Sequence, residues 1–250
     1  MTQQQAPLEH YNADYFKKWN YADRPLGKFS MYWFARRYYA ALVNRYAPTG
    51  GSERKLFEMG CGLGDLLGLL QDNFTAIGVD LIDDAVAQAQ QNAPKADISV
   101  GDATDFSRFS DGELSVVVAL HLVEHLPNPQ ATIQDIYAKL QSGGLFLFAT
   151  PHPDYSLRRF KDHDTDAIGK DKTHINCHVP QVWHDWCESA GFTVIKQFGD
   201  GLWDTPYLPV LPNAVQFAMF GIPAFLQVMT RTTFTPLTMG VNQINIVQKL

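Results

Sequence analysis

The sequence predicts an α/β fold built around a mostly parallel sheet with helices on both faces. Two observations support this prediction. Short apolar runs alternate with helical patterns through the middle of the chain, and these runs are apolar throughout instead of alternating with polar residues. Continuous apolar runs are typical of strands that are buried on both faces, and strands separated by helices form parallel sheets.

The expected elements follow in chain order from these patterns. Strands are expected over residues 55–59, 75–80, 97–100, 114–120, 145–150, 192–198 and 241–248, and helices over 29–46, 65–73, 82–92, 128–141 and 180–190. No Pro or Gly interrupts the first helix, and closely spaced leucines support the second. Unlike the earlier strands, the last one alternates apolar and polar residues.

The helix over 128–141 carries the clearest local signals. Asn128 can cap its first turn, and Pro129 suits its first position. Apolar residues recur at helical spacing, at Ile133, Ile136, Tyr137 and Leu140. Gly143 and Gly144 are expected to end this helix before the next strand begins.

Two segments differ from the alternating core. Residues 1–50 are rich in aromatic side chains and are expected to form an N-terminal helical cap, followed by one domain over 51–250. Within that domain, residues 201–240 separate the last two strands, and 205–230 contain no charged residue. We expect this excursion to cover the functional site. Prolines and polar residues argue against a membrane span, whereas an interfacial membrane contact and an oligomer contact through 205–230 stay open.

Composition and charge exclude several classes of protein. The chain has 250 residues, of which 46% are hydrophobic, and this composition excludes a disordered chain. The formal net charge of −6 would repel phosphate backbones, so nucleic acid is not expected as a partner. Three cysteines are too few for a disulfide framework and suit a reducing compartment. With no secretory signal at its start, the sequence predicts a cytoplasmic protein.

The strongest local motif is LFEMGCGLGDLL, residues 56–67, at the end of the first strand. Gly60, Gly62 and Gly64 can turn the chain into a helix and let a ligand approach the backbone, although a purely structural turn is an alternative. A dinucleotide-binding turn would place its third glycine at position 65, where this chain has Asp65. Because a carboxylate would repel a pyrophosphate, a nicotinamide cofactor is disfavoured.

Carboxylates follow three successive strands. Glu58 ends the first strand, Asp80 ends the second, and Asp102 follows the third. Ligands of open α/β sheets bind beyond the carboxyl ends of the strands, so Asp80 could hold both ribose hydroxyls of a nucleoside and Asp102 an adenine amino group. Each acid could instead cap a helix or a turn. Their joint placement favours the ligand-binding role.

The motif at 56–64, together with GVD at 78–80, GDA at 101–103 and ALHLVEHLPNP at 119–129, resembles the class I S-adenosylmethionine-dependent methyltransferases of the small-molecule, type 11/12-like kind. The resemblance covers about residues 55–250 and implies a Rossmann-like sheet of seven strands, the last antiparallel. It also implies S-adenosyl-L-methionine as the cofactor. Cofactor contacts are thereby assigned to Glu58, Gly60, Cys61, Gly62, Gly64, Asp80, Leu81, Asp102, Ala103 and Leu120.

The resemblance further implies a small-molecule acceptor, with O-methylation favoured. Methyltransferases that act on amines of nucleic acids usually carry an N/D-P-P-Y/F segment where this chain has ALHLVEHL. Histidines are the candidate bases, because imidazole has a pKa of about 6.5 and can accept a hydroxyl proton. Catalytic roles are assigned to His174 and His121, and substrate contacts to His152, His178 and Trp183. Ordinary surface or core positions are the alternative for each histidine.

His121, Glu124 and His125 form an H-x-x-E-H segment. A similar segment with an acid at the first position binds a divalent ion in ubiquinone-biosynthetic O-methyltransferases. The histidine at the first position and the nearby Pro127 lead us to expect no metal ligands here, but an ion at these three residues stays open. A non-catalytic S-adenosylmethionine-binding module, acting through the apolar C-terminal surface, is the alternative to an enzyme. The complete set of cofactor-side residues favours a methyltransferase, class EC 2.1.1.-.

Overall fold

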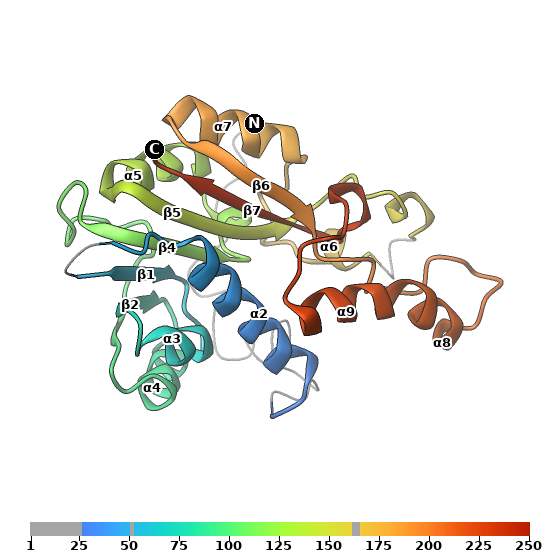
Figure 1. The fold of residues 1–250 in the computed structure, drawn as a ribbon. Coiled ribbons are helices and arrows are strands. Elements are labelled where there is room, and N and C mark those ends of the chain that lie inside the picture. The colour runs from blue at the N-terminus through green and yellow to red at the C-terminus, as the bar shows by residue number, and fades with distance from the viewer. Residues whose placement is uncertain (1–26, 51–52, 162–165) are drawn as a thin grey trace.

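The computed structural model describes residues 27–50, 53–161 and 166–250. Its centre is a seven-stranded sheet in the order β3-β2-β1-β4-β5-β7-β6 (Figure 1). The strands are β1 (Lys55–Met59), β2 (Thr75–Asp80), β3 (Asp97–Val100), β4 (Leu114–Leu120), β5 (Leu140–Pro151), β6 (Thr193–Gly199) and β7 (Asn242–Gln248). β7 pairs antiparallel with β5 and β6, whereas the pairs from β3 to β5 are parallel. The predicted Rossmann-like sheet is therefore confirmed.

Helices cover both faces of this sheet, as predicted (Figure 1). The α-helices are α2 (Met31–Tyr46), α3 (Asp65–Leu70), α4 (Asp83–Asn92), α5 (Pro129–Lys139), α6 (Ala167–Lys170), α7 (Pro180–Ala190), α8 (Asn213–Gln216) and α9 (Ile222–Thr230). Shorter turns are η3 (Val123–His125), η4 (Arg158–Phe160), the π-helix η5 (Phe217–Gly221) and η6 (Leu237–Met239). Among the described residues, every helix is too short or too polar to cross a bilayer.

Successive strand residues point to opposite faces and divide the core in two. In β1, Leu56 packs in the cluster that contains side chains of α2, α3 and α4, whereas Phe57 packs in the cluster with α5 and α7. α2 thus shares a core with the sheet through Leu42 and Val43, which are fully buried. The division into a cap over 1–50 and a domain over 51–250 stays a prediction, and residues 1–26 of that cap lie outside the described part.

Several predicted boundaries differ from the structure: α2 begins at Met31 instead of residue 29, α3 ends at Leu70 instead of residue 73, and β5 begins at Leu140 instead of residue 145. Asn128 caps α5 as expected, since its Oδ1 accepts from the N–H of Ala131. The helix nevertheless ends at Lys139, because Leu140 is extended and pairs with Leu114 of β4. β5 therefore begins at Leu140, and Gly143 and Gly144 lie within it instead of ending the helix.

The connection between β6 and β7 contains α8, η5, α9 and η6. α9 packs against α2, and the rings of Phe34 and Phe225 meet edge-on with centroids 5.7 Å apart. The α2–α9 contact brings the N-terminal helix and this connection together. Covering of an acceptor by them stays a prediction.

Candidate functional site

The turn between β1 and α3 adopts a backbone conformation that favours glycine. Gly60, Gly62 and Gly64 all have left-handed φ values, of 66°, 53° and 73°. A Cβ on Gly64 would lie 2.8 Å from the Cβ and 2.9 Å from the Cα of Ala89 in α4. Gly64 is thus also required for packing between the turn and α4. This packing role agrees with the alternative that the glycine motif is a structural turn.

Asp80 connects the end of β2 to the glycine turn. Its Oδ2 accepts from the N–H of Gly62 at 2.9 Å, and its Oδ1 accepts from the N–H of Ile82 at 3.1 Å. The residue is buried, and this burial raises the pKa of the carboxyl in spite of those hydrogen bonds. Each oxygen keeps lone-pair capacity for a second donor, so the carboxylate could still bind a diol.

Glu58 is a buried acid at the end of β1. Its side chain is 3% exposed, and its Oε2 has no hydrogen-bond partner among the described residues. Burial raises its pKa to about 8, and Arg36 opposes that increase. The neutral acid therefore predominates near neutral pH until a cation, such as the amino group of a ligand, lies beside it.

This raised pKa predicts how stability changes with pH. Because the folded state favours the protonated acid, its contribution to stability is complete below the ordinary pKa of 4.5 and is lost as the pH rises through about 8. Glu58→Gln should not show this loss. Between pH 4.5 and about 8, the melting temperature of the variant minus that of the parent should therefore increase by at least ~2–4 °C. Thermal melts at a series of pH values measure the difference, and parallel curves would contradict the assigned pKa shift.

The other predicted cofactor residues lie at the same edge of the sheet, but their surroundings differ. Asp102 is exposed and accepts from both the N–H and the hydroxyl of Thr104, so it has the turn role that the sequence left open. Ala103 and Cys61 are buried in the two core clusters, and Leu81 is 41% exposed. Leu120 ends β4 and is partly buried.

A histidine–carboxylate cluster follows β4 directly. His121 has a left-handed φ of 55°, which is uncommon for a residue with a side chain and often marks a functional site. Its Nδ1 lies 3.6 Å from Oε1 of Glu124, a side chain that is fully buried. Neither oxygen of Glu124 accepts a hydrogen bond within 3.5 Å from the described residues. A buried carboxylate thus faces a histidine that remains 39% exposed.

His125 and His174 complete this cluster from two parts of the chain. The Nδ1 of His125 donates to the carbonyl of Thr173 at 3.0 Å, and the Nδ1 of His174 donates to the carbonyl of Ile168 at 3.1 Å. The centroids of their rings lie 4.9 Å apart. The possible ligand atoms of Glu124, His125 and His174 all lie within 4.8 Å of one another. With its proton on Nδ1, a neutral His125 keeps a lone pair on Nε2, whereas the Nε2 of His174 lies 3.6 Å from Oδ2 of Asp171.

These three residues fit a divalent cation. Two histidines and a carboxylate are common ligands of transition metals, and histidine ligands usually donate their other ring nitrogen to a carbonyl. The H-x-x-E-H segment suggested His121, Glu124 and His125 as ligands, whereas the cluster in the structure contains His174 instead of His121. The sequence identified His174 only as a candidate base, and its local spacing does not indicate that it lies near Glu124.

The charges of the cluster favour ionised Glu124. Burial alone would raise its pKa, but the contact with His121 and the electrostatic influence of His125, His121 and His174 lower it below its ordinary value. Burial lowers the pKa of His125. The arrangement therefore holds a carboxylate among imidazoles, which can accept a proton or bind a cation.

The three residues predicted to contact substrate are not members of the Glu124–His125–His174 cluster. Trp183 is fully buried against Phe148, and its indole N–H donates to the carbonyl of His178. This is a core position, and the substrate contact assigned to Trp183 stays a prediction. His178 packs against Trp186 and is partly buried, and His152 is buried at the end of β5. Burial lowers the pKa of both histidines.

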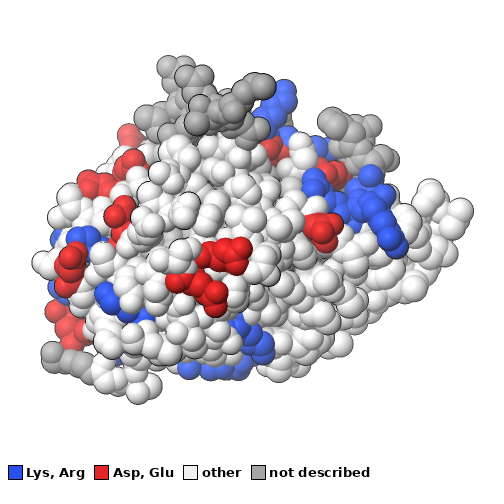
Figure 2. Space-filling view, turned by 90° about the horizontal axis from the view of Figure 1, so that it is seen from above, with Lys and Arg blue, Asp and Glu red and all other residues white. Residues whose placement is uncertain are grey.

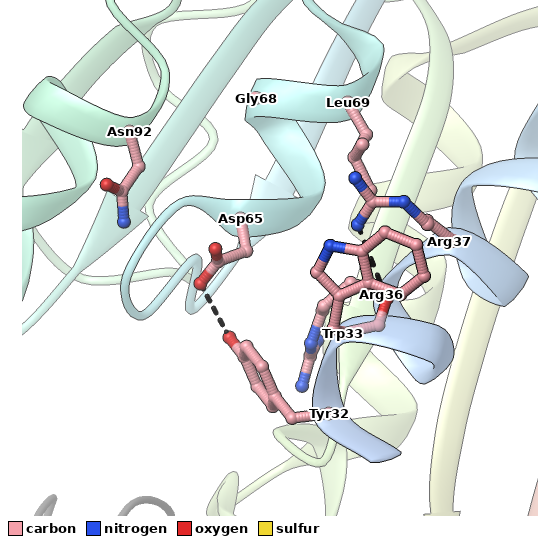
Figure 3. A pocket seen from close by; sticks show the side chains of 8 residues that line it. All are labelled: Tyr32, Trp33, Arg36, Arg37, Asp65, Gly68, Leu69 and Asn92. Carbon is pink, nitrogen blue, oxygen red and sulfur yellow. Dashed lines mark hydrogen bonds between the residues drawn. The ribbon is translucent and has the colours of Figure 1, made fainter. Parts of the chain in front are cut away.

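Asp65, which departs from the dinucleotide pattern, anchors α2. Its Oδ2 accepts from the hydroxyl of Tyr32 at 2.9 Å, and Figure 3 shows this contact at the edge of a cavity of about 260 Å³ between α2, α3 and the end of α4. Arg37, also on this cavity, lies over the ring of Trp33. None of the predicted site residues lines it.

Comparisons with known proteins agree with this architecture. A family described as a methyltransferase domain matches residues 31–197. A probable S-adenosylmethionine-dependent methyltransferase from Mycolicibacterium smegmatis is 32% identical over 48% of this chain and 46% of its own length. A ubiquinone biosynthesis O-methyltransferase from Thiobacillus denitrificans is 27% identical over 58% of this chain and 61% of its own.

The fold comparison extends further along the chain. The crystal structure of a SAM-dependent methyltransferase from Archaeoglobus fulgidus aligns with a TM-score of 0.58 and 21% identity, over 86% of this chain and 94% of that one. At this identity the likeness shows the fold alone. The family match covers well over half of the chain, and the protein therefore belongs to the methyltransferase-domain family.

Proposed function

We propose that this protein transfers a methyl group from S-adenosyl-L-methionine to a hydroxyl of a small-molecule acceptor. The observation that carries the proposal is buried Glu124 among His121, His125 and His174, directly after the β4 strand end. Methyl transfer to a hydroxyl needs a proton acceptor there, whereas a non-catalytic binding module does not. Relatives named ubiquinone biosynthesis O-methyltransferase support the O-methylation class.

The strand-end residues fit this cofactor. The unpartnered Oε2 of Glu58 suits an ammonium group, and Asp80 has free acceptor capacity for ribose hydroxyls. When bound, the cofactor supplies an electrophilic methyl carbon; the acceptor oxygen bonds to that carbon while the carbon–sulfur bond breaks and sulfur keeps the electron pair. The chain aligns the two reactants and removes a proton.

His121 is placed to take that proton. It is the more exposed of the two histidines assigned catalytic roles, with 39% of its side chain accessible against 14% for His174. With Nδ1 toward Glu124, its Nε2 is available to the acceptor hydroxyl, and the carboxylate stabilises the imidazolium that forms. His174 lies beside this pair, with its ligand atom within 4.8 Å of those of Glu124 and His125.

A divalent ion would be held by Glu124, His125 and His174. When bound, it would lower the pKa of a hydroxyl that it contacts and so favour the alkoxide or phenolate form. His121 would still take up the displaced proton.

Turnover tests the proposal. The purified protein is incubated with S-adenosylmethionine and a panel of catechols, phenols and aromatic amines, with and without Mn²⁺, Mg²⁺ or Zn²⁺. We expect S-adenosylhomocysteine and an O-methylated product with at least one hydroxyl acceptor. Cofactor binding by calorimetry without turnover on the whole panel would favour the non-catalytic module, and N-methylation alone would overturn the acceptor class.

Asp80→Ala should weaken cofactor binding at least about tenfold. The substitution removes charge-assisted hydrogen bonds, each contributing ~1.5–3 kcal/mol before water compensates. Titration calorimetry with S-adenosylhomocysteine measures the change. Asp84→Ala, an exposed acid in the first turn of α4, is the matched control and should leave the dissociation constant unchanged. Equal affinities in all three proteins would exclude Asp80 from the cofactor site.

A further inference from the structure

An exposed apolar surface lies where α2 meets the connection between β6 and β7. We define the α2–α9 face as Phe29, the outer side of α2, and residues 213–231. Large apolar side chains are exposed on it, at Phe29, Phe217, Met219, Ile222, Leu226 and Met229. Phe29 lies near Phe34, whose ring contacts Phe225, so the two parts are continuous. Figure 1 shows α8 and α9 extending away from the sheet.

The polarity of this segment is reversed relative to an ordinary surface helix, which exposes its polar residues. Gln216 and Gln227 are fully buried, and both hydrogen-bond backbone groups of the protein. The outward positions of α9 are Ile222, Leu226 and Met229, spaced by four and three residues along one helical face. The segment therefore folds with its amides inward and its apolar side chains toward the surroundings.

The same face carries exposed cations. Lys28, Arg45 and Arg231 are exposed there, in a chain whose net charge is −6, whereas Arg36 and Arg37 line the cavity that also contains Asp65. Arg45 donates to the carbonyl of Arg231 at 2.9 Å.

We propose that the α2–α9 face docks on an anionic lipid bilayer, with α9 lying in the interface. Exposed apolar side chains can enter the headgroup region, and clustered Lys and Arg residues attract anionic lipids. In Figure 2, the right-hand end of the molecule, where α8 lies, is drawn white on the face in view. A symmetric contact with a second copy would bring the same unbalanced cations together, so the charge favours the bilayer. The proposal does not depend on the identity of the acceptor.

Vesicle flotation of the full chain tests this surface. The probes are vesicles of phosphatidylcholine alone and of equal parts phosphatidylcholine and phosphatidylglycerol. We expect at least about tenfold stronger binding to the anionic vesicles at low salt, decreasing as NaCl is added. Binding that is equal for both vesicles, or absent from both, would overturn the proposal. Self-association by light scattering that is lost with Leu226→Gln and Met229→Gln, without vesicle binding, would assign the face to a second copy instead.

Matched variants separate docking from misfolding. Leu226→Gln with Met229→Gln should weaken vesicle binding at least about tenfold, and Arg45→Gln with Arg231→Gln about thirtyfold at low salt. Val100→Gln with Ile195→Gln alters exposed apolar residues outside the face and should leave vesicle binding unchanged. Melting temperatures and S-adenosylhomocysteine affinity report folding. If the control pair weakens binding as much as the α9 pair does, the α2–α9 face is not the docking surface.

Discussion

Replacing Glu124 by glutamine is expected to lower methyl-transfer turnover by about two to four orders of magnitude, the range for loss of acid–base function. The side chain is fully buried, and its carboxylate is the acidic member of a cluster with two histidines. A neutral amide would not stabilise an imidazolium at His121 and would be a poor metal ligand. Cofactor affinity should stay within about threefold, because Glu58 and Asp80 remain.

Single-turnover kinetics and calorimetry with S-adenosylhomocysteine measure these two effects separately. Glu188→Gln is a matched control, because Glu188 lies 3.2 Å from His184 in an exposed pair on α7 and should be neutral for turnover. Titration with Mn²⁺ and Zn²⁺ distinguishes the roles of Glu124: binding by the parent but not by the variant would identify a metal ligand. Turnover within threefold of the parent would exclude the cluster from catalysis.

Glu124 also gives this variant a pH signature. Since its pKa is lowered in the folded protein, the ionised carboxylate contributes stability above the ordinary value of 4.5, and that contribution is lost as the pH falls through the folded value. Glu124→Gln should therefore melt at a lower temperature than the parent above that pH, with the difference shrinking in acid. A constant difference would indicate a packing effect only.

The sheet could be predicted from sequence because buried parallel strands leave an unambiguous pattern. The β5 boundary could not, because Leu140 satisfies the helical spacing of α5 and equally fits a strand position opposite Leu114. Because a leucine at this position would be buried in a helix and in a strand alike, the sequence pattern does not distinguish the two conformations. Pairing with β4, a tertiary contact, decides between the two.

The candidate site shows the same limit. Acids at strand ends could be placed because parallel strands end at one edge of the sheet. His174 joins Glu124 across 50 positions of the sequence, through hydrogen bonds from Ile175 and Asn176 to the carbonyl of Glu124, and local spacing contains no such information. The substrate contact of Trp183 was implied by the family resemblance alone. Its burial on the apolar, core-facing side of α7 is what the spacing of an amphipathic helix can predict.

Gly64→Ala is expected to cost about 2–5 kcal/mol of folding stability and to weaken cofactor binding more than about tenfold. A left-handed φ costs a residue with a side chain roughly 1–2 kcal/mol, and overpacking adds about 1–3 kcal/mol. Here φ is 73°, and the new Cβ would lie 2.8 Å from the Cβ of Ala89 and 2.9 Å from its Cα. To relieve this close contact, α4 or the glycine turn must move. The turn includes Gly62, whose N–H donates to Asp80, so a movement of the turn would disturb the proposed cofactor site.

Gly112→Ala separates the two parts of this cost. Gly112 has the same φ of 73°, but a Cβ there would meet nothing within 4 Å. The Gly112 variant should therefore lose only about 1–2 kcal/mol for its backbone conformation and bind S-adenosylhomocysteine like the parent. Denaturant unfolding gives the stabilities, and calorimetry gives the affinities. Equal losses of stability in the two variants would show that α4 can move to accommodate the new Cβ with no further loss of stability. Unchanged affinity in Gly64→Ala would show that the glycine turn does not contribute to cofactor binding.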